Sequence, residues 1–291
     1  MNEQEKALIK AWSSHPREWE NNTWVYPVIS RRAGGLSLGV NLNPDHHCSF
    51  SCAYCQSGPQ EGHKRIPVDI DAVEQELRAF LAYYASGEFA KCEAYKDVPE
   101  QNKLLKDICL SGDGESTIVK EFPEICRRMR EIQKEYAPKL GDFKLRLITN
   151  ASHIEAETVQ QGLSQLLEDN GEIWAKLDAG SEEWFKKMNR SPLHLEKIID
   201  NLKNAIKSYP LCIQTMLCDL QGEIPSDAEI ERYIEKLSAI YTTSPSNLVE
   251  IQLYTVIRDP LLQGVEALPK EFLESVKTKI TSVLPVKVRC F

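Results

Sequence analysis

The feature that most restricts the fold of this chain is a regular alternation of short apolar segments with longer amphipathic ones. Six segments have the length and composition of β-strands, and each is followed by helical periodicity. The predicted strands cover about 36–43, 107–111, 143–150, 172–178, 211–218 and 249–258, and the helices that follow them cover about 71–86, 122–136, 155–168, 181–189, 193–208, 226–242 and 270–282. Strands joined by helical crossovers are parallel, so we predict an α/β protein.

Each predicted strand has one apolar face and one more polar face. A complete eight-stranded barrel fills its interior with branched apolar side chains, which these polar faces do not supply. Arg146, Lys176 and Glu250 lie on the polar faces. Burying such charges without partners is costly, so they must pair or face a wet cavity. We therefore expect a partial barrel that is open enough to hold ligands.

The alternation runs without a linker, a repeat or a low-complexity stretch. We expect an N-terminal helical arm over 1–34, a core barrel over 35–260, and a C-terminal helix with a possible final strand over 261–291. After its helix, the arm is expected to be irregular. Its tryptophans Trp12, Trp19 and Trp24 would either pack on the main body or form a lid.

The composition is that of an ordinary globular protein, with 42% hydrophobic and 27% charged residues. No apolar run approaches a membrane span, and the N-terminus lacks the apolar core of a signal peptide. The nine scattered cysteines argue for a reducing cytoplasm rather than a disulfide framework. A net charge of −8 without an obvious basic face disfavours a nucleic-acid partner.

Three cysteines lie within eight residues directly after the first predicted strand. They are Cys48, Cys52 and Cys55, and Tyr54 precedes the last of them. Thiolates are soft ligands, and three on one short loop can hold an iron–sulfur cluster. A cubane cluster takes four ligands, so one iron would stay open to a ligand that is not protein.

Two other uses of these cysteines are considered. A zinc site could recruit His46, His47 or His63 as its fourth ligand, although no second Cys/His pair at zinc-finger spacing is present. Cys52 and Cys55 could instead form a disulfide redox pair, which leaves the remaining cysteine of the loop without a role.

The spacing of these cysteines, with Tyr54 before the third, resembles the signature of the radical S-adenosylmethionine (SAM) superfamily. The resemblance covers about residues 35–260 and implies a partial (β/α)6 TIM-type barrel. It also implies a 4Fe–4S cluster whose open iron is chelated by SAM. An electron from a donor such as flavodoxin or ferredoxin then cleaves SAM to methionine and a 5′-deoxyadenosyl radical.

Further residues match the parts of this family that bind SAM. The run Ser111, Gly112, Asp113, Gly114 and Glu115 follows the second strand and resembles the glycine-rich motif that receives the methionine amino group. Thr149 and Asn150 end the third strand, where the family has a Thr-Asn pair. Lys176 and Asp178 end the fourth, where the family contacts the ribose and the methionine carboxylate. Tyr54 matches the aromatic residue beside the adenine. A structural ion pair is the alternative for Lys176 and Asp178.

Within the superfamily, the runs 176–190, 213–216 and 254–258 resemble the wyosine-synthase-like branch. That branch contains an enzyme that builds a tricyclic base from methylated guanosine in tRNA with pyruvate. The wyosine enzyme carries a second cluster on upstream cysteines, whereas residues 1–47 contain no cysteine. The acidic balance also disfavours a grip on tRNA.

Side chains on the fifth and sixth strands are the candidates for substrate contact and catalysis. Gln214, Gln252, Tyr254 and Arg258 are expected on one alternating face. Arg258 suits a carboxylate or phosphate, and the glutamines suit amide or hydroxyl groups. The alternative for Arg258 is a salt bridge with Asp259 or with a helix end.

Three classes of function remain. The leading one is a radical SAM enzyme with one cluster that abstracts hydrogen from a small molecule, an amino acid or a protein residue. A glycyl-radical-enzyme activase is the second, and modification of a tRNA base of the wyosine type is a further alternative of the same chemistry. The third is a non-catalytic zinc-binding module.

Overall fold

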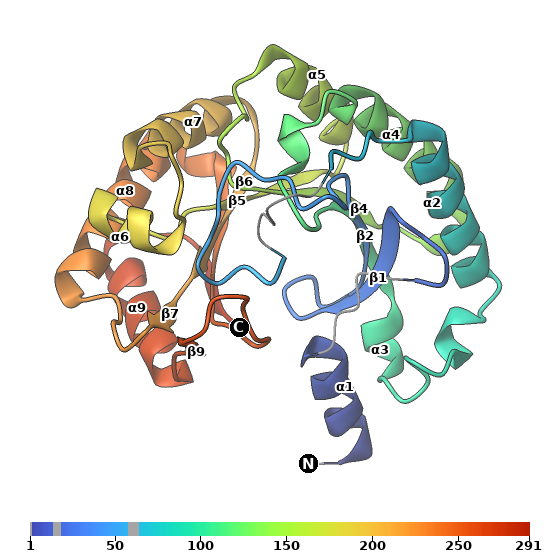
Figure 1. The fold of residues 1–291 in the computed structure, drawn as a ribbon, viewed down its shortest axis with the longest axis horizontal. Helices are drawn as coiled ribbons and strands as arrows, with labels where there is room; N and C mark the ends of the chain where they lie inside the picture. Colours follow the sequence, from blue (N-terminus) through green and yellow to red (C-terminus); the bar gives the residue numbers. More distant parts are fainter. Residues whose placement is uncertain (1, 14–18, 58–63) are drawn as a thin grey trace. The chain divides into compact units, whose positions relative to one another are not determined.

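The computed structural model describes residues 2–13, 19–57 and 64–291, and strands and helices alternate along most of the chain (Figure 1). The strands are β1 (Val25–Ser30), β2 (Gly35–Val40), β3 (Leu105–Leu110), β4 (Lys144–Thr149), β5 (Glu172–Lys176), β6 (Leu211–Met216), β7 (Cys218–Leu220), β8 (Leu248–Tyr254), β9 (Val265–Ala267) and β10 (Val288–Cys290). The α-helices are α1 (Glu3–Ser13), α2 (Ile70–Ala85), α3 (Glu100–Lys103), α4 (Phe122–Leu140), α5 (Glu157–Leu166), α6 (Glu182–Met188), α7 (Leu195–Ser208), α8 (Asp227–Thr243) and α9 (Lys270–Val283). The predicted α/β class is confirmed.

The chain divides into two compact units. The first comprises Met1–Asp45, Lys64–Arg146 and Thr158–Gly171, and the second comprises His46–His63, Leu147–Glu157 and Glu172–Phe291. The first half of β4 therefore belongs to the first unit and its second half to the second. Within the described residues, no helix is both long and apolar enough to cross a membrane.

The sheet of the first unit has the strand order β1-β2-β3-β4. β2 and β3 are parallel as predicted, whereas β1 runs antiparallel to β2 with Val25 opposite Val40. The sequence prediction made 25–30 irregular, which is wrong. Pro27 lies within this strand and weakens the strand pattern, but proline is tolerated on an edge strand, where one side of the backbone needs no partner.

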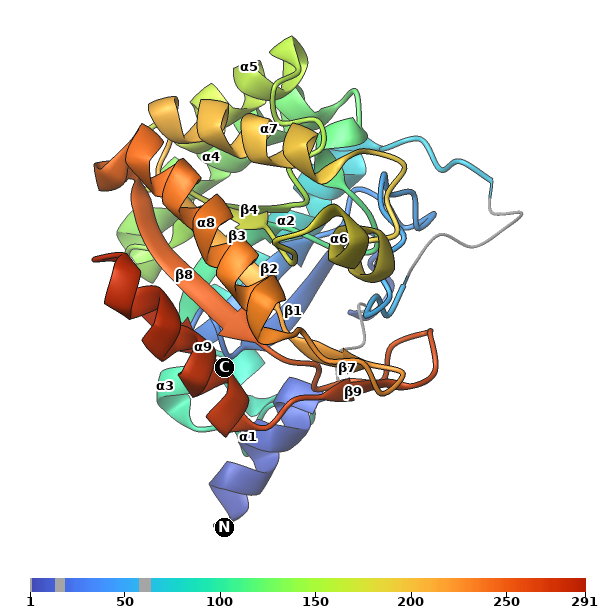
Figure 2. The same ribbon diagram turned by 90° about the vertical axis from the view of Figure 1, so that its left-hand side faces the viewer.

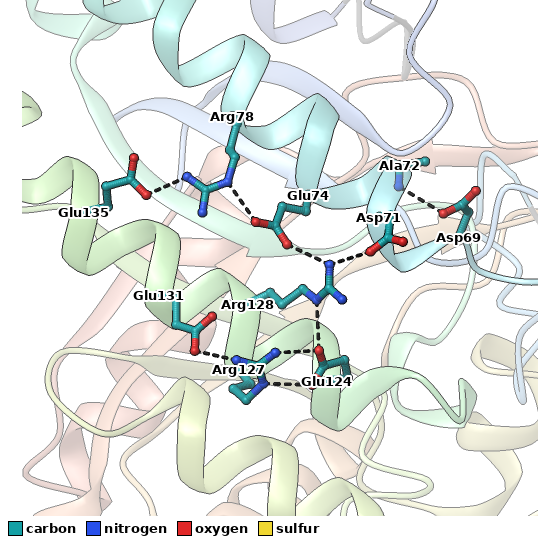
Figure 3. Close-up of polar contacts among 10 residues, drawn as sticks. All are labelled: Asp69, Asp71, Ala72, Glu74, Arg78, Glu124, Arg127, Arg128, Glu131 and Glu135. Carbon is teal, nitrogen blue, oxygen red and sulfur yellow. Dashed lines mark hydrogen bonds and ion pairs between the residues drawn. The ribbon is translucent and has the colours of Figure 1, made fainter.

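Two helices of the first unit are joined by a network of surface ion pairs (Figure 3). From α4, Arg128 reaches Asp71 and Glu74 of α2, each at 2.7 Å. From α2, Arg78 reaches Glu135 of α4 at 2.6 Å. Each helix therefore donates to the other, and more than one ion pair links them.

Trp19 packs into the first unit beside α2. Its ring centroid lies 5.5 Å from that of Phe80, 5.8 Å from Tyr83 and 6.2 Å from Phe89. Aromatic pairs at these distances are favourable beyond the area they bury. For this tryptophan, the prediction that the arm packs on the body is confirmed.

The sheet of the second unit has the order β4-β5-β6-β8-β10, and β5, β6, β8 and β10 are parallel. Helices α7, α8 and α9 lie outside these strands (Figures 1 and 2). The predicted final strand is present as β10. The short antiparallel pair of β7 and β9 was not predicted, because each strand has only three residues.

Charged residues on the inner faces of the strands are paired, as the sequence required. In the first unit, Arg146 donates to the fully buried Asp107. In the second, Arg289 of β10 donates to Glu250 of β8, and Lys287 lies 3.7 Å from the same carboxylate. These pairs neutralise charges that would be costly to bury alone.

Candidate metal and cofactor site

The three predicted metal ligands lie on an irregular loop that is held by the end of α6. Cys48, Cys52 and Cys55 are free thiols and half-buried. The amides of Ser51 and Ala53 donate to backbone carbonyls of Asn189 (3.2 Å) and Met188 (2.8 Å). The cysteine loop is thus fixed on both sides of Cys52 by backbone hydrogen bonds.

Each of the three sulfur atoms has a polar side chain beside it. The side-chain amide of Asn150 donates to Cys48 Sγ at 3.7 Å, and that of Asn189 donates to Cys52 Sγ at 3.6 Å. Hydrogen-bond donors around soft thiolate ligands are the surroundings in which proteins hold iron–sulfur clusters. The donor set of this loop therefore fits such a cluster.

The histidines proposed for a zinc site have a different arrangement. The ring Nδ1 of His46 forms a hydrogen bond with the carbonyl of Ser57 at 2.8 Å, and His63 lies outside the described residues. Within the described part of the chain, no three His, Cys, Asp or Glu side chains converge on a point where one ion could bind. The thiolates of a cubane bind separate irons, so that chemistry does not require such convergence.

Asp178 is surrounded by hydrogen-bond donors. One carboxylate oxygen accepts from the amide of Met216 (2.8 Å) and lies 3.2 Å from the ammonium of Lys176. The other accepts from the side-chain amide of Asn189 (2.8 Å) and from the hydroxyl of Tyr54. A carboxylate has about four acceptor positions, so all of them are used. The structural ion pair considered for Lys176 and Asp178 is present.

The ammonium of Lys176 lies between two aromatic rings. It is 4.8 Å from the ring centroid of Tyr54 and 4.5 Å from that of Tyr254, and it also donates to the hydroxyl of Tyr254. Burial lowers the pKa of Lys176, but the charge of Asp178 and the contact with Tyr254 outweigh it, and the pKa is raised. Lys176 is therefore a cation at neutral pH.

Cys52 is a protonated thiol when no metal is bound. Burial, followed by the charge of Asp178, raises its pKa to about 12, although Lys176, Tyr54 and Asn189 act in the opposite direction. A metal that binds this sulfur must displace its proton. Tyr54 also keeps its proton, since burial and then Asp178 raise its pKa well above the usual value.

Three of the four candidate substrate residues lie on neighbouring strands. Gln214 of β6 stands beside Lys176 of β5 and Gln252 of β8 in register, and its amide donates to Gln252 at 2.8 Å. Tyr254 ends β8. The predicted strand 249–258 was four residues too long, because β8 ends at Tyr254. Arg258 therefore lies in the half-buried loop after β8 and not on the alternating face.

Two buried oxygens near these residues have no hydrogen-bond partner among the described residues. They are Oε1 of Gln214 and Oδ1 of Asn189. Both side chains are almost completely buried, at 0% and 2% exposure. Buried acceptors are normally satisfied by protein, water or ligand, so these two atoms are available to a donor that enters the unit.

The glycine-rich loop belongs to the first unit, where Asn41 organises it. Oδ1 of Asn41 accepts from the amide of Asp113 at 3.1 Å, and its Nδ2 donates to the carboxylate of the same residue. A side chain at Gly112 would have its Cβ 2.3 Å from Asn41 Oδ1, so the close approach requires glycine. The sequence prediction gave Asn41 no role in this loop. Its only signal was its place on the polar face of the predicted strand 36–43, two residues before that strand ends.

Glu115 is buried, at 3% exposure, and also shapes this loop. Its Oε1 accepts from the amide and the hydroxyl of Thr117, at 3.2 and 2.7 Å, at the start of a short 3₁₀-helix over Ser116–Ile118. The loop thus holds two carboxylates in place, those of Asp113 and Glu115, within one short segment.

Solved structures with the same fold were found for nearly the whole chain. SuiB of Streptococcus suis, solved bound to S-adenosylmethionine, superposes on 90% of this chain and 52% of its own, with a TM-score of 0.57 and 12% identity. TYW1, solved with a lysine–pyruvate adduct, superposes on 96% of this chain and 82% of its own, with a TM-score of 0.58 and 14% identity. The fold is that of the radical SAM enzymes. The fold that the resemblance to this superfamily implied is thereby confirmed.

Relatives in sequence extend the likeness to a UPF0026 protein of Synechocystis sp., 27% identical over 91% of this chain and 95% of that protein. A protein named GTPase Obg from Brachyspira hyodysenteriae is 26% identical over 86% of this chain. This chain spans only 32% of that relative and contains no GxxxxGK(S/T) phosphate-binding run, so the GTPase name is not carried over. No family model matches the sequence.

Proposed function

We propose that this chain is a radical SAM enzyme that holds one 4Fe–4S cluster through Cys48, Cys52 and Cys55. When bound, the cluster would supply the electron that splits SAM into methionine and a 5′-deoxyadenosyl radical, which takes a hydrogen atom from a small-molecule, amino-acid or protein substrate. The observation that supports this most is the pair of side-chain amides directed at two of the three sulfurs, in a fold shared with a SAM-bound enzyme.

The residues of the chain have distinct tasks in this proposal. In the first unit, Asp113 and Glu115 offer carboxylates to the ammonium group of SAM. In the second, the cationic Lys176 attracts an anionic group, and Asp178 keeps that cation charged and in place. The open acceptor on Gln214 suits an N–H or O–H of the substrate. Arg258, in the loop after β8, is the candidate for a carboxylate or phosphate.

Pyruvate chemistry of the kind named for TYW1 is not part of the proposal. The ammonium of Lys176 is paired with Asp178 at 3.2 Å, which favours a binding role for this lysine over a nucleophilic one. Residues 1–47 contain no cysteine that could bind a second cluster, and the chain carries a net charge of −8. A radical enzyme with one cluster and a substrate other than tRNA is the better match.

The test is reductive cleavage of SAM by anaerobically reconstituted protein. With SAM and dithionite, which stands in for a flavodoxin or ferredoxin donor, we expect slow release of 5′-deoxyadenosine and methionine. Cys52→Ala should lose iron and cleavage together, because alanine cannot replace a thiolate ligand. Cys290→Ala, which changes another half-buried cysteine of the same unit, should retain both.

Two results would contradict the proposal. Release of methylthioadenosine would mean that the other C–S bond breaks and that a 3-amino-3-carboxypropyl group is transferred. A colourless protein that takes up zinc but no iron or sulfide would instead identify a non-catalytic metal-binding module.

A further inference from the structure

Two asparagines of the second unit each lie beside one sulfur of the cysteine loop. Asn150 follows the last residue of β4, and Asn189 follows the last residue of α6. Both are buried, with 7% and 2% of their surface exposed. Each directs a side-chain nitrogen at a different cysteine sulfur, Asn150 at Cys48 and Asn189 at Cys52.

The orientation of each amide is fixed by its neighbours. Oδ1 of Asn150 accepts from the backbone amide of Ser152 at 3.0 Å, and a backbone amide can only donate, so the nitrogen must face Cys48. Nδ2 of Asn189 donates to Asp178 at 2.8 Å. Because a carboxylate can only accept, the atom beside it must be the nitrogen, and the same nitrogen faces the sulfur of Cys52. In both cases the neighbouring groups require the side-chain nitrogen, which is a donor, to face the sulfur.

Each amide nitrogen carries two hydrogens and has two acceptors. Asn150 Nδ2 has Ser49 Oγ at 2.9 Å as well as the sulfur of Cys48, and Asn189 Nδ2 has Asp178 as well as the sulfur of Cys52. One hydrogen can serve the oxygen and the other the sulfur. The third sulfur has a weaker neighbour, the hydroxyl of Ser57 at 4.0 Å from Cys55.

We propose that Asn150 and Asn189 are positioning residues that donate N–H···S bonds to two cluster thiolates and thereby set the reduction potential of the cluster. This inference rests on the proposed function. A hydrogen bond to a thiolate favours the state with more negative charge, which is the cluster after it has accepted one electron from its donor. The pair of amides therefore makes the cluster easier to reduce.

The test compares matched variants of the reconstituted protein by a redox titration followed by electron paramagnetic resonance. Asn150→Leu and Asn189→Leu keep the size of the side chain but remove the donor. We expect each to favour the oxidised cluster about ten-fold, a shift of about 59 mV to more negative potential for a one-electron couple.

Asn247→Leu is the matched control. Asn247 is a half-buried asparagine of the same unit whose amide donates to the carbonyl of Ile206 at 2.8 Å. Its replacement removes an amide of equal size and should leave the potential unchanged. Asn150→Leu and Asn189→Leu proteins that hold a full cluster at the wild-type potential would overturn the proposal.

A measurement on the unchanged protein covers the case in which the leucine variants do not fold. Protein labelled with ¹⁵N in asparagine side chains should show weak nitrogen coupling to the reduced cluster in pulsed resonance spectra. Absence of this coupling in protein that carries a full cluster would refute the inference. Failure of the wild-type protein to assemble any cluster would refute the proposed function instead.

Discussion

At the scale of single residues, Asp178 has the most constrained surroundings in the candidate site. Its two oxygens accept from or pair with four groups, and one of these is the buried cation of Lys176. A carboxylate that is already saturated serves to hold its neighbours, so a direct contact with a ligand would require one of these bonds to be given up. We therefore expect changes at Asp178 to act on stability as well as on activity.

We predict that Asp178→Asn destabilises the metal-free protein by about 3–5 kcal/mol, because it leaves the ammonium of Lys176 buried without its counter-charge. Urea denaturation measures the change. The double variant Lys176→Met/Asp178→Asn should recover a large part of the loss, since the uncompensated charge is gone. A double variant no more stable than Asp178→Asn would show that the ion pair is not the cause.

A second prediction concerns the carboxylate of Glu115. Its replacement by alanine should weaken SAM binding by about ten- to a hundred-fold, the range expected when a charged hydrogen bond of about 1.5–3 kcal/mol is lost. Iron content should not change. Isothermal titration with SAM measures the affinity.

Because Glu115 also caps the short 3₁₀-helix, Thr117→Val is the control. It removes the hydroxyl that bonds to the carboxylate but leaves the carboxylate itself, so SAM affinity should stay close to wild type. Equal losses in both variants would mean that the turn, and not the charge, matters for binding.

The site residues that the sequence revealed differ from those that it did not reveal in how far apart along the chain their contacts lie. Three cysteines within eight residues are visible as a local pattern, and so is a glycine run after a strand. The contact of Asn189 with Cys52 spans 137 residues, and that of Asn150 with Cys48 spans 102. Asn189 was passed over for this reason, and Asn150 was predicted only as a SAM contact.

At the scale of elements, the α2–α4 ion network offers a direct test of surface electrostatics (Figure 3). Hydrogen bonds from Arg127 and then Arg128 lower the pKa of Glu124 to about 2. The side chain is 37% exposed, so solvent screens the interaction. We predict that Glu124→Gln lowers the free energy of unfolding by about 0.5–1 kcal/mol at low salt, and by less in 1 M salt.

The pH dependence follows from the depressed pKa. The contribution of Glu124 is fully present above the pKa of an unfolded glutamate, about 4.3, and is lost as the pH falls toward about 2. Glu274→Gln is the comparison, because the ion pair of Glu274 with Lys277, at 3.0 Å, lies outside this network. If both variants lose the same stability and respond equally to salt, the network adds nothing beyond isolated pairs.

The elements that were predicted correctly are those with many residues in phase. The helices and strands of the α/β alternation each bury one face, so their apolar residues recur at a regular spacing in the sequence. β1 was missed because Pro27 interrupts its pattern, and β7 and β9 were missed because three residues carry too little pattern. The end of β8 was misplaced because apolar residues continue past Tyr254.

At the scale of the whole molecule, the net charge bears on whether this chain can bind RNA. A net charge of −8 repels a phosphate backbone at long range. We predict no retention of tRNA in a gel-shift assay at 150 mM salt, with or without the cluster. Binding that weakens steeply with salt would indicate a local basic face and would return wyosine-type chemistry to consideration.

The long-range anchoring of the cysteine loop also has a consequence for the order of folding. Its sulfurs meet partners 102 and 137 residues away along the chain, and such contacts carry the largest loop-closure entropy. The loop can therefore take its final shape only after the end of β4 and the end of α6 are in place. We expect iron and sulfide to enter a chain whose second unit has already folded, so that cluster assembly follows folding and does not direct it.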